Sequence, residues 1–333
     1  ILNGKRGILS STSFLGSLHL VPSFIKYPHL GIIDKFWSLY GLIKAKRLDL
    51  SKNAINLDQE SLYHWLKRHH QTERAINNLW NLFILPALND DVRQVSASMG
   101  LMVFQESLLK KPMDAILGFS KIGLSSLTGA PAQHYLEKKG GQLILGKTVR
   151  SVIIENGRIG GVKLSDGITL QSDFYISALP FDTLLQILPQ EVSTDPFFSK
   201  ASGLSFSPII GIHLWYDKPI MDQDFVSFLG SPIQWVFNRT LIQGDKKTTG
   251  QHICISISGA WGYMDKPKEE IIKIFVREMG KMFPRANRAH IERSLVIKQP
   301  QATFRSIPGM IEHRLPQTTP IPNLCLAGEW TNT

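Results

Sequence analysis

The sequence predicts an α/β protein with more than one domain. The chain has 333 residues, which is more than a single hydrophobic core usually accommodates. Apolar residues recur at helical spacing in the first third, whereas short strands bounded by glycine turns follow from residue 130 onward. The hydrophobic content of 43% and the charged content of 19% are those of an ordinary folded protein, which excludes a disordered chain.

The first predicted helix begins near Asp34 and ends in a basic segment with Lys44, Lys46 and Arg47. Such a helix usually packs on a core. The alternative is that residues 14–48 form a surface that enters the headgroup region of a bilayer, with aromatic side chains at the interface and cations on the headgroups. The sequence leaves both possibilities open.

Three further helices are expected in the first third of the chain. One extends from Asp58, as its N-cap, to Arg68, and its apolar face carries Leu62, Trp65 and Leu66. The second covers residues 72–83 and should end before Pro86, because proline interrupts a helix. The third covers residues 95–109.

A helix, several short strands and a returning strand are expected between residues 130 and 178. Pro131 begins the helix and Gly140 ends it, which is the usual asymmetry of helix ends. The dipeptides Asn156-Gly157 and Asp166-Gly167 predict tight hairpins. The expected strands are Gln142–Leu145, Thr148–Ile154, Arg158–Leu164, Ile168–Leu170 and Phe174–Ala178.

The rest of the chain is expected to form further strands and one amphipathic helix. The helix, Glu269–Met282, should bury Ile271, Phe275 and Met279 on one face. The expected strands are Pro208–Tyr216, Ser231–Asn238, Ile253–Gly259, Leu295–Lys298 and Leu324–Ala327.

The formal net charge of +10 favours polyanionic partners, either nucleic acid or an anionic membrane surface. No zinc-finger spacing, helix-turn-helix signal or RNA-binding signature accompanies the charge, so we expect no nucleic acid partner. Cys254 and Cys325 are far apart and form neither metal-ligand nor redox spacing, so we expect small core residues and no metal site.

No segment has the composition of a membrane-spanning helix or the anatomy of a signal peptide. The sequence therefore predicts a cytoplasmic protein that contacts the inner face of the membrane peripherally.

Several motifs resemble a known family. The helix, meander and returning strand of residues 130–178 resemble the second half of an FAD-binding domain of the glutathione-reductase (two-dinucleotide) type. Four segments resemble the hydroxysqualene dehydroxylases (squalene-associated FAD-dependent desaturases) of the phytoene desaturase and flavin amine oxidase superfamily, in the order of that family. They are Trp80–Asn89, Ile212–Pro219, Gly230–Asn238 and Leu326–Thr331. The run Gly-Ser-Pro-Ile-Gln-Trp-Val-Phe favours the dehydroxylase group.

The resemblance implies FAD as cofactor, a C30 isoprenoid as substrate, and reductive removal of the hydroxyl group of hydroxysqualene to give squalene. An alternative is a carotenoid desaturase of the phytoene type, which uses the flavin in the opposite direction. An alternative of another class is a non-enzymatic isoprenoid-binding protein.

The resemblance also implies roles for individual residues. Those expected to contact FAD are Val149, Ala178, Pro180, Gly328 and Glu329. Gly328 would let the backbone approach the flavin chain, and Glu329 would accept a hydrogen bond from a ribityl hydroxyl. Those expected to line a substrate tunnel are His213, Trp215, Gln234 and Trp235. No catalytic side chain is assigned, because FAD carries the hydride.

The expected domains alternate along the chain. Residues 1–125 and 183–300 would form an interleaved α+β substrate domain, and residues 126–182 and 301–333 the FAD-binding domain. The chain begins at Ile1 and ends at Thr333, directly after an expected strand and glycine turn. We therefore expect a fragment that lacks the Gly-x-Gly-x-x-Gly turn for the FAD diphosphate and is inactive by itself.

Overall fold

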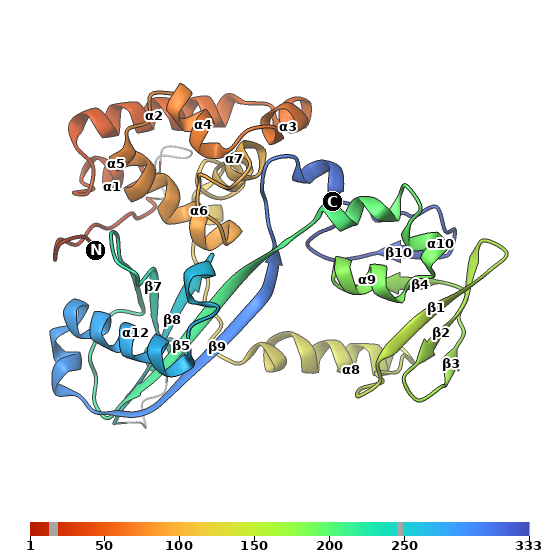
Figure 1. Ribbon diagram of the computed structural model, residues 1–333. Helices are drawn as coiled ribbons and strands as arrows, with labels where there is room; N and C mark the ends of the chain where they lie inside the picture. The colour runs from red at the N-terminus through yellow and green to blue at the C-terminus, as the bar shows by residue number, and fades with distance from the viewer. Residues whose placement is uncertain (13–18, 245–248, 333) are drawn as a thin grey trace. The chain divides into compact units, whose positions relative to one another are not determined.

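The computed structural model describes residues 1–12, 19–244 and 249–332 (Figure 1). The chain forms two compact units, each discontinuous in sequence. Unit 1 contains residues 1–123 and 206–308, and unit 2 contains residues 124–205 and 309–333. The chain passes from one unit to the other after residues 123, 205 and 308. The boundaries expected from the sequence are residues 125, 182 and 300. The roles assigned to these segments stay predictions.

The first part of unit 1 is helical, as expected, and has its own core. The core includes Leu62, Leu66, Trp80 and Phe104, all almost fully buried. The α-helices are α1 (Val21–Ile25), α2 (Ile32–Arg47), α3 (Leu50–Asp58), α4 (Leu62–Arg68), α5 (Glu73–Ala75), α6 (Asn81–Leu88) and α7 (Ala97–Val103). Two segments have π-helical hydrogen bonding, η2 (Ile76–Trp80) and η3 (Phe104–Leu108), and a 3₁₀ turn, η4 (Pro112–Ala115), follows.

Two predicted helix boundaries are wrong. Asp58 is the last residue of α3 rather than a cap, and it is buried where its carboxylate accepts a hydrogen bond from the Ser96 hydroxyl. Ser61 caps α4 instead, since its hydroxyl accepts from the His64 amide. Pro86 lies inside α6, which ends at Leu88 and is followed by Asn89 in a left-handed conformation with φ of 55°. The fixed φ of proline suits a helix, and α6 continues past Pro86 although its backbone cannot donate a hydrogen bond there.

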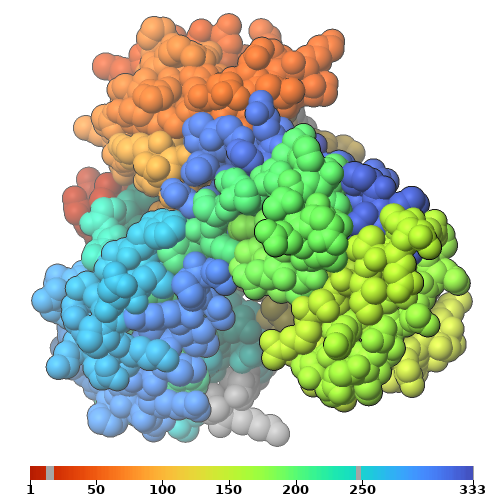
Figure 2. Space-filling view, turned by 45° about the vertical axis from the view of Figure 1, so that its right-hand side comes forward, coloured from red at the N-terminus to blue at the C-terminus, as the bar shows by residue number. Residues whose placement is uncertain are grey.

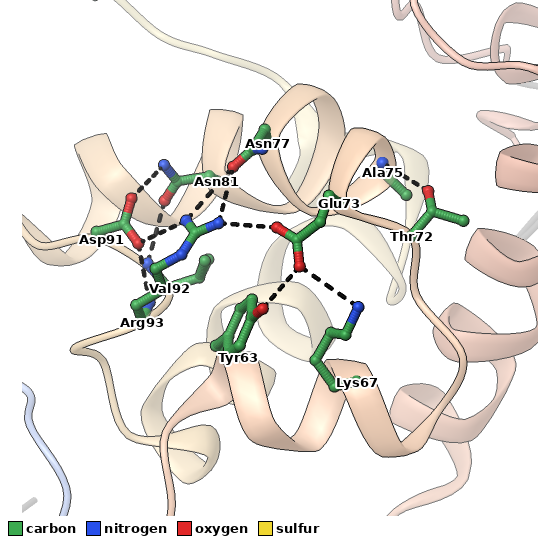
Figure 3. A network of polar contacts seen from close by, with 10 residues as sticks. All are labelled: Tyr63, Lys67, Thr72, Glu73, Ala75, Asn77, Asn81, Asp91, Val92 and Arg93. Atoms are coloured by element: carbon green, nitrogen blue, oxygen red, sulfur yellow. Dashed lines mark hydrogen bonds and ion pairs between the residues drawn. The ribbon is translucent and has the colours of Figure 1, made fainter.

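A polar network connects α4, α5 and α6 at the surface (Figure 3). The Glu73 carboxylate accepts from the Tyr63 hydroxyl at 2.7 Å and from the Arg93 guanidinium at 2.9 Å, and Lys67 lies 3.4 Å away. The hydrogen bond from Tyr63 is the main reason why the pKa of Glu73 is lowered. Asn81 accepts from the backbone amide that follows Asp91. The network therefore holds residues 91–93 against the helices.

The second part of unit 1 is an antiparallel sheet with one face covered by a helix. The strand order is β6 (Phe225–Ser227), β7 (Trp235–Asn238), β8 (Gln251–Ser258), β5 (Phe206–Tyr216) and β9 (Ile291–Phe304). The amphipathic helix α12 (Lys268–Met282) buries Ile271, Phe275 and Met279 against this sheet, as predicted. In Figure 2 the sky-blue atoms of the α12 segment form part of the outer surface of unit 1. Shorter elements are α11 (Arg239–Gln243), η7 (Trp261–Tyr263) and η8 (Pro284–Arg288).

Unit 2 contains the meander and a parallel strand pair. The meander has the order β1 (Val149–Glu155), β2 (Arg158–Leu164), β3 (Thr169–Leu170), and β4 (Tyr175–Ser177) pairs in parallel with β10 (Leu324–Leu326). Asn156 and Gly157 have φ of 51° and 72°, which is the backbone of the predicted hairpin. The helical elements are η5 (Ser125–Gly129), α8 (Ala130–Lys138), α9 (Phe181–Ile187), α10 (Gln190–Ser193), η6 (Phe198–Gly203) and η9 (Met310–His313).

The strand expected at Gln142–Leu145 is not formed. These residues are exposed, and no described strand pairs with them. Without a neighbouring strand, the backbone N–H and C=O groups of an apolar segment cannot form the hydrogen bonds of a sheet. Within the described part of the chain, no helix is both long and apolar enough to cross a bilayer.

Candidate functional site

The turns expected to contact FAD lie side by side at the carboxyl ends of β4 and β10. The Ala327 amide donates to the Ser177 carbonyl oxygen at 2.8 Å, which extends the pairing of the two strands. One turn further, the indole of Trp330 donates to the Leu179 carbonyl oxygen at 3.0 Å. Ligands of α/β proteins bind at this end of parallel strands. The fold therefore brings Ala178 and Pro180 next to Gly328 and Glu329.

Gly328 has a backbone conformation that other residues rarely adopt. Its φ is 143°, and a Cβ atom there would lie 3.0 Å from the indole nitrogen of Trp330. The carbonyl oxygen of Gly328 accepts from both the amide and the hydroxyl of Thr331, at 3.1 and 2.7 Å. Gly328 is exposed, so this fixed stretch of backbone is open to a ligand.

Val149 lies on a different strand from the other four cofactor residues. It is the half-buried first residue of β1, paired with Leu164 of β2. The meander is attached to the parallel pair through Asn323, whose carboxamide donates to the Ile159 carbonyl oxygen and accepts from the Ile159 amide. Val149 therefore belongs to the meander, and the other four residues belong to the two turns.

The groups around the two turns fit a flavin nucleotide. Glu329, at the exposed tip of its turn, offers a carboxylate that can accept from a polyol. The Ser177 hydroxyl is buried at the end of β4 and has no hydrogen-bond partner among residues 1–12, 19–244 and 249–332, so a bound ligand could satisfy it. No cluster of three metal-ligating side chains occurs among the residues that the structure describes.

A second surface is the face of the unit 1 sheet that α12 does not cover. In β5, residues of one face are buried against α12 while those of the other face are half-buried, and the latter include His213 and Trp215. Trp235 is opposite Ser256, which is opposite Gly211, so all three share the face of His213. The structure therefore brings together three of the four residues expected to line a tunnel.

Gln234 has a different surrounding. It precedes β7, and its carboxamide donates to the Ser258 carbonyl oxygen at 2.9 Å and accepts from the Ser258 amide at 2.8 Å. Both polar groups of the side chain are thus used in extending the sheet. Gln234 also borders a pocket of about 540 Å³ whose lining includes the charged side chains of Asp90 and Arg305 and the ring of Trp261.

Most of the residues on this sheet face were not predicted from the sequence. One row crosses all five strands and consists of Phe225, Phe237, Cys254, His213 and Leu295. Its neighbours include Ile297 and His252, and Phe119 packs on Phe225 with ring centroids 4.8 Å apart. The alternation of His252, Cys254 and Ser256 in β8 was the available signal, since residues two apart share a face.

His213 and His252 form a hydrogen-bonded pair on this face. The Nδ1 of His213 is 3.0 Å from the Nε2 of His252, and the Nε2 of His213 is 3.9 Å from the Cys254 sulfur. The His252 ring stacks on Trp215 with centroids 4.3 Å apart. Burial, followed by the charges of His213, Arg239 and Arg293, lowers the pKa of His252 to about 4. Burial also lowers the pKa of His213.

An apolar cavity of about 310 Å³ lies beside the β6–β7 edge of the sheet. Phe225 and Trp235 line it from the sheet, and Leu82 and Phe83 line it from α6. A smaller cavity of about 100 Å³ shares Leu9 and Phe83 with it and extends to Leu39 and Ile43 of α2, and its exposed lining is almost entirely apolar. The walls of both cavities are mainly apolar, which suits a hydrocarbon ligand.

Residues 8–333 match the family described as flavin containing amine oxidoreductase. This chain belongs to the flavin-containing amine oxidoreductase family. Among curated members, the 15-cis-phytoene desaturase of Synechococcus elongatus is 26% identical over 290 residues, which cover 83% of this chain and 60% of that protein. A probable zeta-carotene desaturase of the same organism is 24% identical, with 83% and 62% covered. The chain thus spans less than two thirds of the length of these two relatives.

Solved structures share the fold of this family member. An oxidoreductase from Methanosarcina mazei has a TM-score of 0.65 at 17% identity, over 98% of this chain and 74% of that one. A cyclohexylamine oxidase from Brevibacterium oxydans has a TM-score of 0.62 at 14% identity, over 94% and 70%. Membership of the family confirms the α/β fold with an FAD-binding domain and a substrate domain, and supports FAD as the cofactor.

Proposed function

We propose that this family member acts on a long isoprenoid and removes the hydroxyl group of hydroxysqualene to give squalene. The observation that carries the proposal is the apolar sheet face, with the cavity of about 310 Å³ at its edge. Aromatic residues of three strands line that face, among them Phe225, Trp235 and Trp215. The run Gly230–Asn238, which resembles the dehydroxylases, forms its β7 edge.

The chain would contribute positioning and exclusion of water. When bound, reduced FAD supplies a hydride to carbon, and the substrate loses its hydroxyl group as water after accepting one proton. Gly328 and Glu329 would hold the polyol part of the cofactor, with Ala178 and Pro180 beside them and Val149 at the adenine, as the resemblance implies. The apolar residues of the sheet face would bind the hydrocarbon chain of the substrate and exclude water from it.

The curated relatives favour a second candidate, a carotenoid desaturase. The names of the Synechococcus proteins refer to the desaturation of phytoene and zeta-carotene. In that case oxidised FAD would accept a hydride and the substrate would lose two hydrogens. The same apolar face would serve, since phytoene is also a long hydrocarbon.

We also propose that α2 docks on an anionic membrane surface, where such a substrate resides, so that the protein is cytoplasmic and peripheral. The orientation of α2 supports this. Its small or polar residues Asp34, Ser38, Gly41 and Ala45 face inward, and five of its large apolar residues are exposed. The exposed fractions are 88% for Ile32, 69% for Ile33, 65% for Phe36, 40% for Leu39 and 43% for Ile43.

Specific contacts fix α2 in this orientation. The buried Asp34 accepts from the Thr72 hydroxyl at 2.6 Å, and the Gln71 carboxamide donates to the Trp37 carbonyl oxygen at 2.6 Å. At Gly41 an added Cβ would lie 2.8 Å from the Gln71 side chain. The helix therefore has an apolar outer face and a basic end, the combination that binds an interface with anionic lipids.

The test uses the complete reading frame that encodes this chain. The purified protein is incubated anaerobically with reduced FAD and hydroxysqualene, and the products are identified by mass spectrometry. Squalene supports the dehydroxylase. Loss of hydrogen from phytoene with oxidised FAD, without squalene formation, supports the desaturase and overturns the first proposal.

A further inference from the structure

The histidine pair lies on a sheet face that is mostly apolar and whose other polar residues include Ser256, Arg293 and Gln299. Across the strands, His213 lies between Cys254 and Leu295, and in the next row Trp215 lies between His252 and Arg293. Both rings are half-buried. A face that bound only hydrocarbon would gain nothing from two imidazoles, because each must lose water when an apolar chain covers it.

The hydrogen bond inside the pair fixes what the outer nitrogens can do. A neutral imidazole has one N–H donor and one acceptor nitrogen. If His213 Nδ1 donates to His252 Nε2, the outer nitrogen of His213 accepts and that of His252 donates; the other tautomer exchanges these roles. Because the Cys254 sulfur already contacts the outer nitrogen of His213 at 3.9 Å, the outer nitrogen of His252, which is a donor or an acceptor according to the tautomer, is the one that can meet a ligand. A hydroxyl group, which is itself a donor and an acceptor, is the smallest ligand that complements it.

The surroundings keep the pair neutral. The Arg293 guanidinium lies 4.8 Å from the centre of the Trp215 ring that stacks on His252, and Arg239 also lowers the pKa of both histidines. A charged pair would attract an anion, whereas a neutral pair selects an uncharged polar group. The sulfur of Cys254, 3.9 Å from His213, is protonated, since burial raises the pKa of this thiol to about 11.

We propose that His213 and His252 form the site that recognises the hydroxyl group of a hydroxylated polyisoprenoid and so selects the alcohol over the hydrocarbon. This inference rests on the proposed function, and it specifies that the ligand of the sheet face is an alcohol. It distinguishes the two candidate reactions, because phytoene has no hydroxyl group. The apolar residues of the row, Phe225 and Phe237 on one side and Leu295 on the other, would bind the isoprenoid chain, and the pair would fix where the hydroxyl group lies on the sheet face.

The test compares the binding of hydroxysqualene and squalene, which share one carbon skeleton. The complete protein with oxidised FAD, which cannot reduce the substrate, is titrated with each ligand in detergent, and tryptophan fluorescence is recorded. The variants are His213→Phe and His252→Phe, with Phe237→Leu as an apolar control in the same row. His252→Gln, which keeps one donor and one acceptor, covers the case in which a phenylalanine variant does not fold.

The wild-type protein should bind the alcohol about tenfold more tightly than the hydrocarbon, which is the effect of about one hydrogen bond. In both phenylalanine variants the ratio of the two affinities should fall close to one, and His252→Gln should give an intermediate ratio. Phe237→Leu should weaken the binding of both ligands equally, so the ratio should stay that of the wild type. A ratio that survives in the histidine variants overturns the inference but leaves the proposed function intact. A wild-type protein that binds neither ligand overturns both.

Discussion

The carboxamide of Gln234 forms hydrogen bonds with both backbone polar groups of Ser258, at 2.8 and 2.9 Å. The Gln234 side chain thus makes the two hydrogen bonds that a further residue of β7 would make with β8 through its backbone. Replacing Gln234 by alanine would leave two partly buried backbone groups without partners, which costs about 1–3 kcal/mol.

We therefore expect Gln234→Ala to lower the free energy of unfolding by about 1–3 kcal/mol in urea denaturation. Gln243→Ala, at an exposed position at the end of α11, is the matched control and should have little effect. A loss of substrate affinity with unchanged stability would instead make Gln234 a tunnel residue.

A second prediction concerns Gly328, where φ is positive and a side chain would meet the Trp330 indole. Gly328→Ala should weaken FAD binding about tenfold or more, because the turn must move away from the cofactor, and should cost about 1–3 kcal/mol in backbone strain. Gly167→Ala is the control: its φ is 87°, yet an added Cβ meets nothing within 4 Å. It should lower stability and leave FAD affinity unchanged. Equal losses of FAD affinity in both variants would contradict the assigned role.

A third prediction concerns the outer face of α2. The double substitution Ile33→Asp and Phe36→Asp should lower binding to vesicles that contain anionic lipid at least tenfold, since each removed side chain contributes about 1.5–3 kcal/mol when buried. Co-sedimentation measures this. Ile55→Asp, at a 60% exposed position on α3, is the control. Trp37 is unsuitable as a target because its ring packs on His70 at 4.5 Å. If the double variant sediments with the vesicles as the wild type does, the proposal that α2 contacts the membrane is wrong.

A fourth prediction concerns pH. The pKa of His252 is about 4 in the folded protein, below its ordinary value of 6.5, so the unfolded chain binds this proton first as the pH falls. His252 therefore removes stability progressively between about pH 6.5 and pH 4, and has no such effect above that range. Urea denaturation at pH 7, 6 and 5 should show a smaller loss of stability on acidification for His252→Phe than for the wild type. Trp215→Phe, which keeps both histidines, should retain the wild-type dependence.

Features governed by local chemistry could be predicted from the sequence. Asn156 and Gly157 adopt the positive φ values that a two-residue hairpin requires, and α12 has the buried face that its apolar spacing indicates. The predicted strand at 295–298 is shorter than the observed β9, which begins at Ile291 and contains Pro300. The strand β9 continues to Phe304, since it is at the edge of the sheet and the register shifts opposite Ser207, where a missing amide is tolerated.

Features that depend on distant residues could not be predicted. Both Asp58 and Ser61 are suitable caps, and the choice follows from the hydrogen bond between Asp58 and Ser96, 38 residues away. His213 was proposed for the tunnel, but its partner His252 is found only when the register between β5 and β8 is known. The outward orientation of the apolar side of α2 follows from Asp34 and Gly41, whose partners Thr72 and Gln71 belong to later segments.

The pairing of β4 with β10 has a consequence for biosynthesis. The two strands are about 150 residues apart, so β4 leaves the ribosome long before its neighbour exists. The helices of residues 21–109 have a core of their own and can collapse early, whereas the turn that carries Gly328 forms only with the last residues of this segment. During translation the β4 edge therefore stays open to other strands, and we expect chaperones that shield such edges to raise the yield of folded enzyme.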